Sequence, residues 1–351
     1  MTRPVLAIGP ANYAGQAHEW AQAVNRNLDA TAWSFQRGPI RSGGFAFPAD
    51  RTIPAAEFHT SLFRRPRSKR LLRGTTHVAL DGYQPYFRLI RKRVFKRDAA
   101  WLARQECEVA LIAHGTDVRD PDLHRERDKW SYFNEGDDAW RQHLREFTAR
   151  NRATAQDMGL PLFVSTPDLL LDLPSATWLP VCIDVDAFAA EDDALQRQVP
   201  RVLHLPSRRN PPIKGTQYVD PILSKLQAEG LIEYISPESV AHAEMPRLVK
   251  GCDIVVDQIL SGFYGVAAAE AMASGRVLVG RLAPDVAELM PEQPAIVDAD
   301  PDTLEEVIRG ILSDREAALA QAQSNVAFVR RWHDGRAAAA AMAGFLGVSA
   351  P

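Results

Sequence analysis

The sequence has no long apolar segment and few cysteines. None of the apolar runs in its 351 residues reaches the roughly 18 residues needed to span a bilayer, and the N-terminus lacks the apolar core and cleavage site of a signal peptide. Cys107, Cys182 and Cys252 are odd in number, far apart and flanked by apolar residues, which excludes a disulfide framework and a zinc-binding pattern. We therefore expect a cytoplasmic protein with buried free thiols.

The sequence also has little net charge, and the value of −3 excludes a protein that coats nucleic acid over its whole surface. This average conceals a basic segment: between Arg64 and Arg97, twelve Lys and Arg residues stand against Asp81 alone, a local charge of +11 that leaves −14 elsewhere. The stretch Tyr86–Gln105 has the pattern of a basic amphipathic helix. Its charged face is either simply solvated or attracted to an anionic acceptor or membrane, which would make the protein peripheral at the inner membrane face. No aromatic platform accompanies the charge, so nucleic acid is not an expected partner.

The chain has the composition and length of a two-domain globular protein. It is 46% hydrophobic and 24% charged, and 351 residues exceed what one core usually organises. Short apolar runs alternate with amphipathic stretches, which predicts an α/β protein with two Rossmann-like, doubly wound parallel-sheet domains. The expected strands are Pro4–Ile8, Ala30–Phe35, His77–Leu80, Val109–Ala113, Leu162–Ser165, Val202–Leu205, Ile232–Ile235, Ile254–Asp257 and Val277–Gly280. The expected helices are Gln16–Leu28, Tyr86–Gln105, Trp140–Met158 and three that begin at Thr216, Ala243 and Val266.

Prolines and an acidic run mark the expected domain boundary. Pro174, Pro180 and Pro200 punctuate the chain around Glu191-Asp-Asp193, which predicts an N-terminal domain over residues 1–180, a linker over 181–200 and a C-terminal domain over 201–327. Asp300 and the proline after it predict the capped start of a helix near residues 303–313. A C-terminal helix over about 328–351 is expected to pack back on the first domain.

The most informative motif lies between Asp257 and Gly275. A strand ends at Asp257, a loop with Gly262 and Gly265 follows, and a helix of small residues begins near Val266. The start of such a helix offers backbone N–H groups and the positive end of its dipole to an anion, and Gly265 permits close approach, which predicts a diphosphate site. Glu270, one turn into the helix, is placed to accept hydrogen bonds from ribose hydroxyls. The alternative is a packed helix with a solvated glutamate.

A basic loop follows the first strand of the second domain. Arg208 and Lys214 flank a proline-stiffened stretch that ends where a helix begins. Cations held at the carboxyl end of a strand suit a phosphoryl group, whereas the alternative is an ordinary basic surface loop.

These two stretches together resemble the C-terminal half of glycosyltransferases of the GT-B fold, in particular the retaining family 4 (group 1) with its Glu-x7-Glu signature. The elements that match the family in order and spacing are Gly265, Glu270, Ala271-Met-Ala, Gly275 and the basic loop Lys214-Gly215. The resemblance covers about Arg201–Ala320 well and the first half weakly. It implies two wound domains facing a cleft, transfer of a sugar from a nucleotide diphosphate donor with retention, and no metal cofactor.

The resemblance also implies roles for individual residues. Arg208 and Lys214 would neutralise the donor diphosphate, Gly265, Val266 and Ala267 would bind it through backbone N–H groups, and Glu270 would hold the ribose. Val240, in the loop after Ile232–Ile235, would contact the base, and a UDP-sugar is favoured over a GDP-sugar. The expected acceptor is a glycan, a lipid-linked acceptor or a small molecule.

One departure from the family affects the sugar site. The first signature glutamate, which contacts the transferred sugar, should stand at Gly262. The residues expected near the sugar are Asp257, Gln258, Gly262, Phe263 and Tyr264. Since the glutamate is missing, a non-catalytic sugar-nucleotide or membrane-binding subunit remains an alternative, and a sugar-nucleotide epimerase of the same fold is a second one.

The first domain offers two candidate ligand loops. Asn12, Tyr13 and Gly15 join the first strand to its helix, where Gly15 would open the helix toward a phosphate, although a plain tight turn fits equally. His114 and Asp117 follow the strand that ends at Ala113. His114 resembles the cleft histidine of the family and would contact a sugar hydroxyl or steer the acceptor. The alternative is a structural histidine in a turn capped by Asp117.

Overall fold

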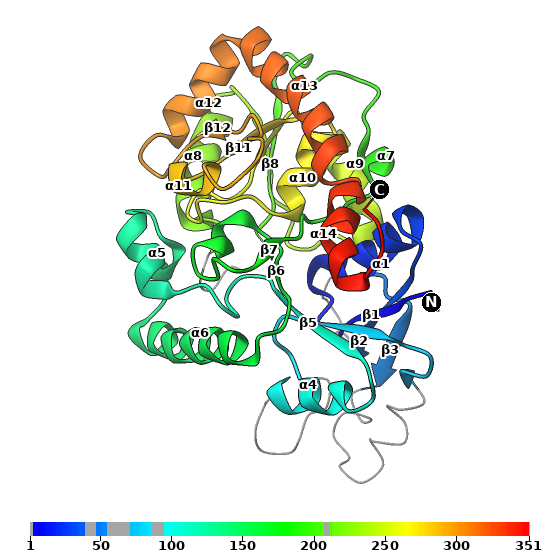
Figure 1. Cartoon of the computed structure of the whole chain (residues 1–351). Helices are drawn as coiled ribbons and strands as arrows, with labels where there is room; N and C mark the ends of the chain where they lie inside the picture. The colour runs from blue at the N-terminus through cyan, green and yellow to red at the C-terminus, as the bar shows by residue number, and fades with distance from the viewer. Residues whose placement is uncertain are drawn as a thin grey trace. The chain divides into compact units, whose positions relative to one another are not determined.

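The computed structural model describes residues 3–38, 47–54, 71–85, 95–206, 211 and 213–350. The chain divides into two compact units. Unit 1 comprises Met1–Arg119, Glu146–Cys182 and Gly335–Pro351, and unit 2 comprises Asp120–Arg145 and Ile183–Asp334. Each unit is built around its own parallel sheet (Figure 1). Arg208 and nine of the twelve basic residues of the segment Arg64–Arg97 lie outside the described residues.

Unit 1 contains a 7-stranded sheet in the order β3-β2-β1-β4-β5-β6-β7, and every neighbouring pair is parallel. The strands are β1 (Val5–Gly9), β2 (Thr31–Gly38), β3 (Arg51–Pro54), β4 (His77–Asp81), β5 (Glu108–Ala113), β6 (Leu162–Val164) and β7 (Thr177–Trp178). The inner strands are buried apolar runs because helices cover both faces of a parallel sheet.

The helices of unit 1 bury one core on each face of this sheet. They are η1 (Tyr13–Gly15), α1 (Gln16–Asn27), α4 (Phe95–Ala103), most of α6 (Asp138–Met158), η3 (Pro167–Leu170) and α14 (Arg336–Leu346). The C-terminal helix α14 packs against α1, and Met342 shares a core with Leu6 and Trp20 (Figure 1). The core on the other face gathers Phe35, Leu80 and other apolar residues.

Unit 2 contains a 5-stranded parallel sheet in the order β12-β11-β10-β8-β9. The strands are β8 (Arg201–His204), β9 (Glu233–Ile235), β10 (Ile254–Val256), β11 (Val277–Gly280) and β12 (Val297–Asp298). The helices are α5 (Pro121–Arg127), η2 (Tyr132–Glu135), α7 (Val185–Phe188), α8 (Thr216–Ala228), η4 (His242–Glu244), α9 (Met245–Lys250), α10 (Val266–Ala273), α11 (Pro284–Ala287), α12 (Leu304–Ser313) and α13 (Arg315–Trp332).

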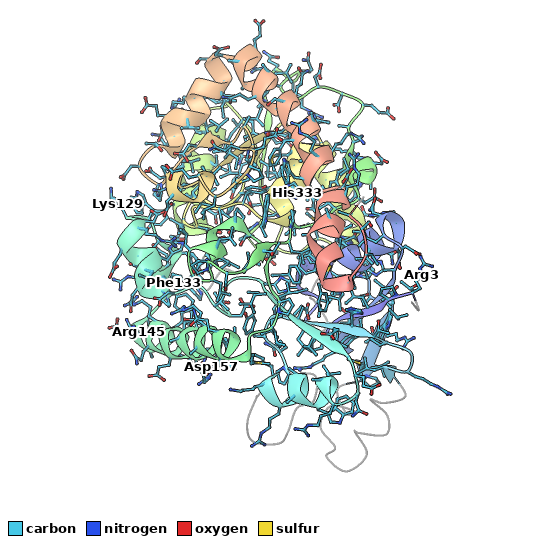
Figure 2. All side chains as sticks on the ribbon, in the orientation of Figure 1. Arg3, Lys129, Phe133, Arg145, Asp157 and His333 are labelled. Atoms are coloured by element: carbon cyan, nitrogen blue, oxygen red, sulfur yellow. The ribbon has the colours of Figure 1, made fainter. Side chains whose placement is uncertain are left out.

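The segment Asp120–Arg145, which the sequence places in the N-terminal domain, groups with unit 2. Phe133, labelled in Figure 2, is fully buried in the core of that unit together with Val256 and Leu223. The backbone N–H of Tyr132 also donates to the carbonyl of Leu260 over 3.0 Å. Apolar burial on the second sheet therefore outweighs proximity in sequence.

The predicted fold class is confirmed, and the observed differences have local causes. Three strands lack a sequence signal: β3 is largely exposed, and β7 and β12 have two residues each. The helix expected at Tyr86–Gln105 is observed as α4, and residues 86–94 lie outside the described part. The prediction that Asp300 caps a helix near residues 303–313 is confirmed. Its carboxylate accepts from the N–H groups of Asp302 and Thr303, its carbonyl accepts from the Leu304 N–H over 2.9 Å, and α12 runs from Leu304. No described helix is long and apolar enough to cross a bilayer.

Candidate functional site

The start of α10 is an accessible patch within a buried stretch of unit 2. Gly265 is the N-cap residue, and no described side chain caps the helix. Gly265, Val266 and Ala267 are half-buried, whereas residues 259–264 and 268–274 around them are buried. The first backbone N–H groups of a helix have no acceptor within it, so this accessible end can bind an anion.

Three charged side chains predicted separately from the sequence meet in the interior of unit 2. The Lys214 Nζ donates to Asp257 Oδ1 over 2.6 Å, and both side chains are buried. Glu270, which is 5% exposed, interacts electrostatically with both. We call Lys214, Asp257 and Glu270 the charged cluster. It joins the loop before α8, the end of β10 and the first turns of α10.

Burial controls the protonation of Glu270. It raises the pKa of this carboxyl to about 8 from its ordinary 4.5, with Lys214 lowering and Asp257 raising the value. No described residue donates a hydrogen bond to the Glu270 side chain, so its oxygens remain available to a ligand. Burial in the interior therefore disfavours the ionised form of Glu270.

The local fold brings Lys214 to this place through Gly215 and His204. Gly215 has φ +85°, and a Cβ there would lie 2.5 Å from Ile259 Cγ1, so only glycine lets α8 begin so close to the loop after β10. His204, at the end of β8, contacts the Val256 carbonyl over 2.8 Å and the Thr216 hydroxyl over 2.9 Å. Burial lowers its pKa to about 4, so the imidazole is neutral.

Gly262, where the family glutamate is expected, adopts a backbone conformation that explains the glycine. Its φ is +68°, and a Cβ would lie 3.0 Å from the Cβ of Ala283. Its carbonyl accepts a 2.9 Å hydrogen bond from the Ala283 N–H. A side chain at this position is therefore strained by the backbone and crowded by the loop after β11.

We expect Gly262→Ala to lower the free energy of unfolding by about 1–2 kcal/mol, the cost of a left-handed conformation for an L-residue. Gly310→Ala is the matched control, because Gly310 lies inside α12 with nothing near its Cβ position and alanine there should add up to about 1 kcal/mol. Urea denaturation measures both. Equal stability of Gly262→Ala and the native chain would contradict the left-handed conformation.

The side chains of the expected sugar contacts lie in different surroundings. The Tyr264 side chain points into the interior, where its hydroxyl lies 3.0 Å from His333 Nε2, and burial raises its pKa. Asp257 is engaged by Lys214. Phe263 is also buried, whereas Gln258 is half-buried with its Nε2 3.5 Å from the Cβ position of Gly265.

Val240 lies half-buried in the loop between β9 and η4, and none of its described contacts tests its role as a base contact.

In unit 1 the structure gathers the predicted loops around a residue that the sequence does not single out. The buried Asp81, at the end of β4, accepts 2.7 Å hydrogen bonds from the N–H groups of Ala11 and Asn12. His114 Nε2 lies 3.6 Å from Asp81 Oδ2. The His114 ring stacks on Trp20 and meets the edge of Tyr13, which is 48% exposed. Asp81 is an acid at the carboxyl end of a central strand, a signal that could have identified it.

Several polar groups in these loops are used to hold the backbone. The Asn12 amide donates to Gln36 Oε1 and to the Pro48 carbonyl, which holds the turn between β1 and α1. Asp117 accepts from the N–H groups of His114 and Gly115 over 2.9 and 2.7 Å, which is the capping role named as its alternative. Gly15 has φ +74° and is the N-cap of α1.

The described residues contain no group of three or more His, Cys, Asp or Glu side chains arranged to hold a metal ion.

Comparisons with known proteins give structural matches only. No protein-family model and no curated protein matches the sequence. Sucrose-phosphate synthase from Thermosynechococcus elongatus matches with a TM-score of 0.64 and 12% identity over 98% of each chain. HepE from Anabaena, in complex with UDP, matches with a TM-score of 0.60 and 12% identity over 98% of this chain and 99% of its own.

The chain has the GT-B fold. A UDP-N-acetylglucosamine 2-epimerase also matches, with a TM-score of 0.53 and 9% identity over 99% of this chain and 96% of its own. A GT-B fold at this level of identity therefore fixes the architecture, and the chemistry has to be argued from the residues themselves.

Proposed function

We propose that this GT-B chain is a glycosyltransferase that moves a sugar from a nucleotide diphosphate donor to an acceptor. The observation that carries the proposal is the accessible start of α10 beside the charged cluster of Lys214, Asp257 and Glu270. A diphosphate needs a cation and backbone N–H donors, and a ribose needs an acceptor for its hydroxyls. In unit 2, Lys214 in the loop before α8 is the cation, the start of α10 has the N–H donors, and Glu270 in α10 is the acceptor.

The residues suggest how the reaction is assisted. As the bond between the sugar and the diphosphate breaks, negative charge grows on the departing phosphate. The N-terminus of α10 and the Lys214 ammonium group would stabilise that charge, because only one of the three N–H groups of Lys214 donates to Asp257. Glu270 would accept from ribose hydroxyls and so fix the donor. Arg208 would be a second cation for the diphosphate.

The finer features of the reaction extend the proposal. A UDP-sugar is the favoured donor, supported by the complex of the structurally similar HepE with UDP. Retention of configuration and independence of metal follow from the family resemblance. The acceptor, whether glycan, lipid-linked or small molecule, is assigned to unit 1, where the exposed Tyr13 adjoins His114. Contact of the basic segment Arg64–Arg97 with an anionic membrane is proposed from its charge.

The test is a substitution that blocks the site without disturbing the fold. Gly265 has φ −131°, an extended conformation open to any residue, and its Cβ position meets only Gln258. We therefore expect Gly265→Val to keep the native melting temperature but to weaken UDP binding by about tenfold or more, because the branched side chain keeps phosphate from the helix start. Calorimetry measures the binding. Unchanged affinity for UDP would remove the start of α10 from the site.

Gly262 favours one second candidate, a sugar-nucleotide binder without turnover, because the signature glutamate is missing here and a side chain at this position would be strained and crowded. Assays of donor hydrolysis and transfer with several sugar nucleotides distinguish the two. Tight nucleotide binding with no turnover for any donor favours the binder, and exchange of the sugar configuration without transfer favours an epimerase.

A further inference from the structure

An ion pair between Arg281 and a residue from the segment Asp120–Arg145 lies beside Gly262. Arg281 follows β11 directly, and its Nη1 is 2.8 Å from Oδ1 of Asp128. Asp128 belongs to the segment Asp120–Arg145 and lies between α5 and η2. The Asp128 side chain is 6% exposed and that of Arg281 is 20% exposed. Asp128 and the Nη1 atom of Arg281 are therefore buried, and the rest of the Arg281 side chain is partly exposed.

The position of Arg281 links it to the start of α10. Its backbone N–H donates to the Gln258 carbonyl over 2.9 Å, and Gln258 Nε2 lies 3.5 Å from the Cβ position of Gly265. Gln258 thus stands between Arg281 and the accessible end of α10. Arg281 is also at the carboxyl end of a strand, the edge at which parallel sheets hold ligands.

Gly262 keeps the space next to this pair free of a side chain. A Cβ at Gly262 would lie 3.5 Å from Asp128 Oδ2 and 3.0 Å from Ala283. The loop before α10, the loop after β11 and the segment Asp120–Arg145 therefore meet at this ion pair in unit 2.

The Asp128 carboxylate is buried with incomplete hydrogen bonding, which is energetically unfavourable, and packing alone does not explain it. Oδ1 also accepts a 2.8 Å hydrogen bond from the Trp130 N–H, but the buried Oδ2 has no hydrogen-bond partner among the described residues. Burial raises the pKa of this carboxyl, against the lowering effect of the Trp130 N–H and of Arg281. Buried, incompletely satisfied carboxylates are uncommon in folded proteins, and they concentrate at functional sites.

We propose that Arg281 binds the transferred sugar of the donor and that Asp128 is the positioning residue that orients its guanidinium. The inference rests on the proposed function and names the residue that acts where Gly262 provides no side chain. Because the ion pair has no net charge, the sugar it fits is uncharged, with hydroxyl oxygens that accept from the N–H groups of Arg281 that Asp128 does not engage.

Calorimetry with UDP and UDP-glucose separates contacts with the sugar from contacts with the nucleotide. We expect Arg281→Ala to weaken UDP-glucose binding about tenfold and UDP binding less than about twofold, with partial recovery in Arg281→Lys. Arg309→Ala, which removes two surface ion pairs of α12, with Glu229 and Glu305, should change neither. Equal weakening for both ligands, or no change for either, overturns the role of Arg281. A native protein that binds neither ligand overturns the proposed function as well.

Two further measurements test the positioning role and the uncharged sugar. Asp128→Asn keeps the shape of the side chain and should weaken UDP-glucose binding while leaving UDP binding unchanged. If UDP-glucose binding stays native in Asp128→Asn, the positioning role is wrong. The native protein should bind UDP-glucuronic acid no more tightly than UDP-glucose, and tighter binding would contradict an uncharged sugar.

Discussion

Replacement of Lys214 by alanine should lower the free energy of unfolding by about 3–5 kcal/mol, besides weakening diphosphate binding. The lysine is buried with its ammonium group 2.6 Å from Asp257 and close to Glu270. Without it, two carboxyl groups remain in the interior with no cation, and an uncompensated buried charge is among the most destabilising changes in a protein. Urea denaturation of unliganded protein measures this effect separately from ligand binding.

The matched control is Lys225→Ala. Lys225 pairs with Glu305 over 2.8 Å, but its side chain is 56% exposed, so the loss should be below about 1 kcal/mol. Equal losses for the two lysines would mean that the charged cluster is as hydrated as the protein surface. Lys214→Met, which fills a similar volume, should be as destabilising as Lys214→Ala if the missing charge is the cause.

Glu270→Gln should change the pH dependence of stability. The native carboxyl has a pKa of about 8, raised by burial above the unfolded value of 4.5. Between these values the folded state binds the proton that the unfolded state has lost, so the native chain loses stability as pH rises, by up to about 1.4 kcal/mol per pH unit. Glutamine does not titrate, so the variant should gain stability relative to the native chain from pH 5 to pH 8.

The control variant is Glu305→Gln, for which we expect the opposite change in stability with pH. Hydrogen bonds from Lys225 and Arg309 lower the pKa of the exposed Glu305. Glu305 therefore stabilises the folded state once it is ionised, and Glu305→Gln should lose a little stability at pH 8 and less as pH falls through the range in which the acid titrates. Urea titrations at several pH values measure both variants. Parallel profiles for native protein and Glu270→Gln would show that this carboxyl is hydrated.

The parts of the site that could be predicted from the sequence are those encoded locally. The start of α10 at Val266 follows from a glycine before a run of small helix formers, and the position of Lys214 follows from a loop between a buried strand and Thr216. The alternation of apolar runs and amphipathic stretches is equally local, and it predicts the two parallel sheets.

The remaining features depend on contacts between segments far apart in the sequence. The pairing of Lys214 with Asp257 spans 43 residues, and the burial that raises the pKa of Glu270 depends on the packing of α10 against the rest of unit 2. Nothing local predicts that Tyr264 points inward to His333, or that Phe133 joins the core of unit 2. Spacing along the chain gives the identity of candidate residues, whereas only packing gives their partners.

The route of the segment Asp120–Arg145 limits how this protein can be divided or recombined. The chain passes from unit 1 to unit 2 at residue 120, returns at 146, passes again at 183 and returns at 335. A truncation that expresses only residues 183–334 would omit Phe133 and Asp128. Part of the core of unit 2 would then be missing, and Arg281 would lose its ion-pair partner. Chimeras that exchange donor preference between proteins of this fold should therefore carry residues 120–145 together with 183–334.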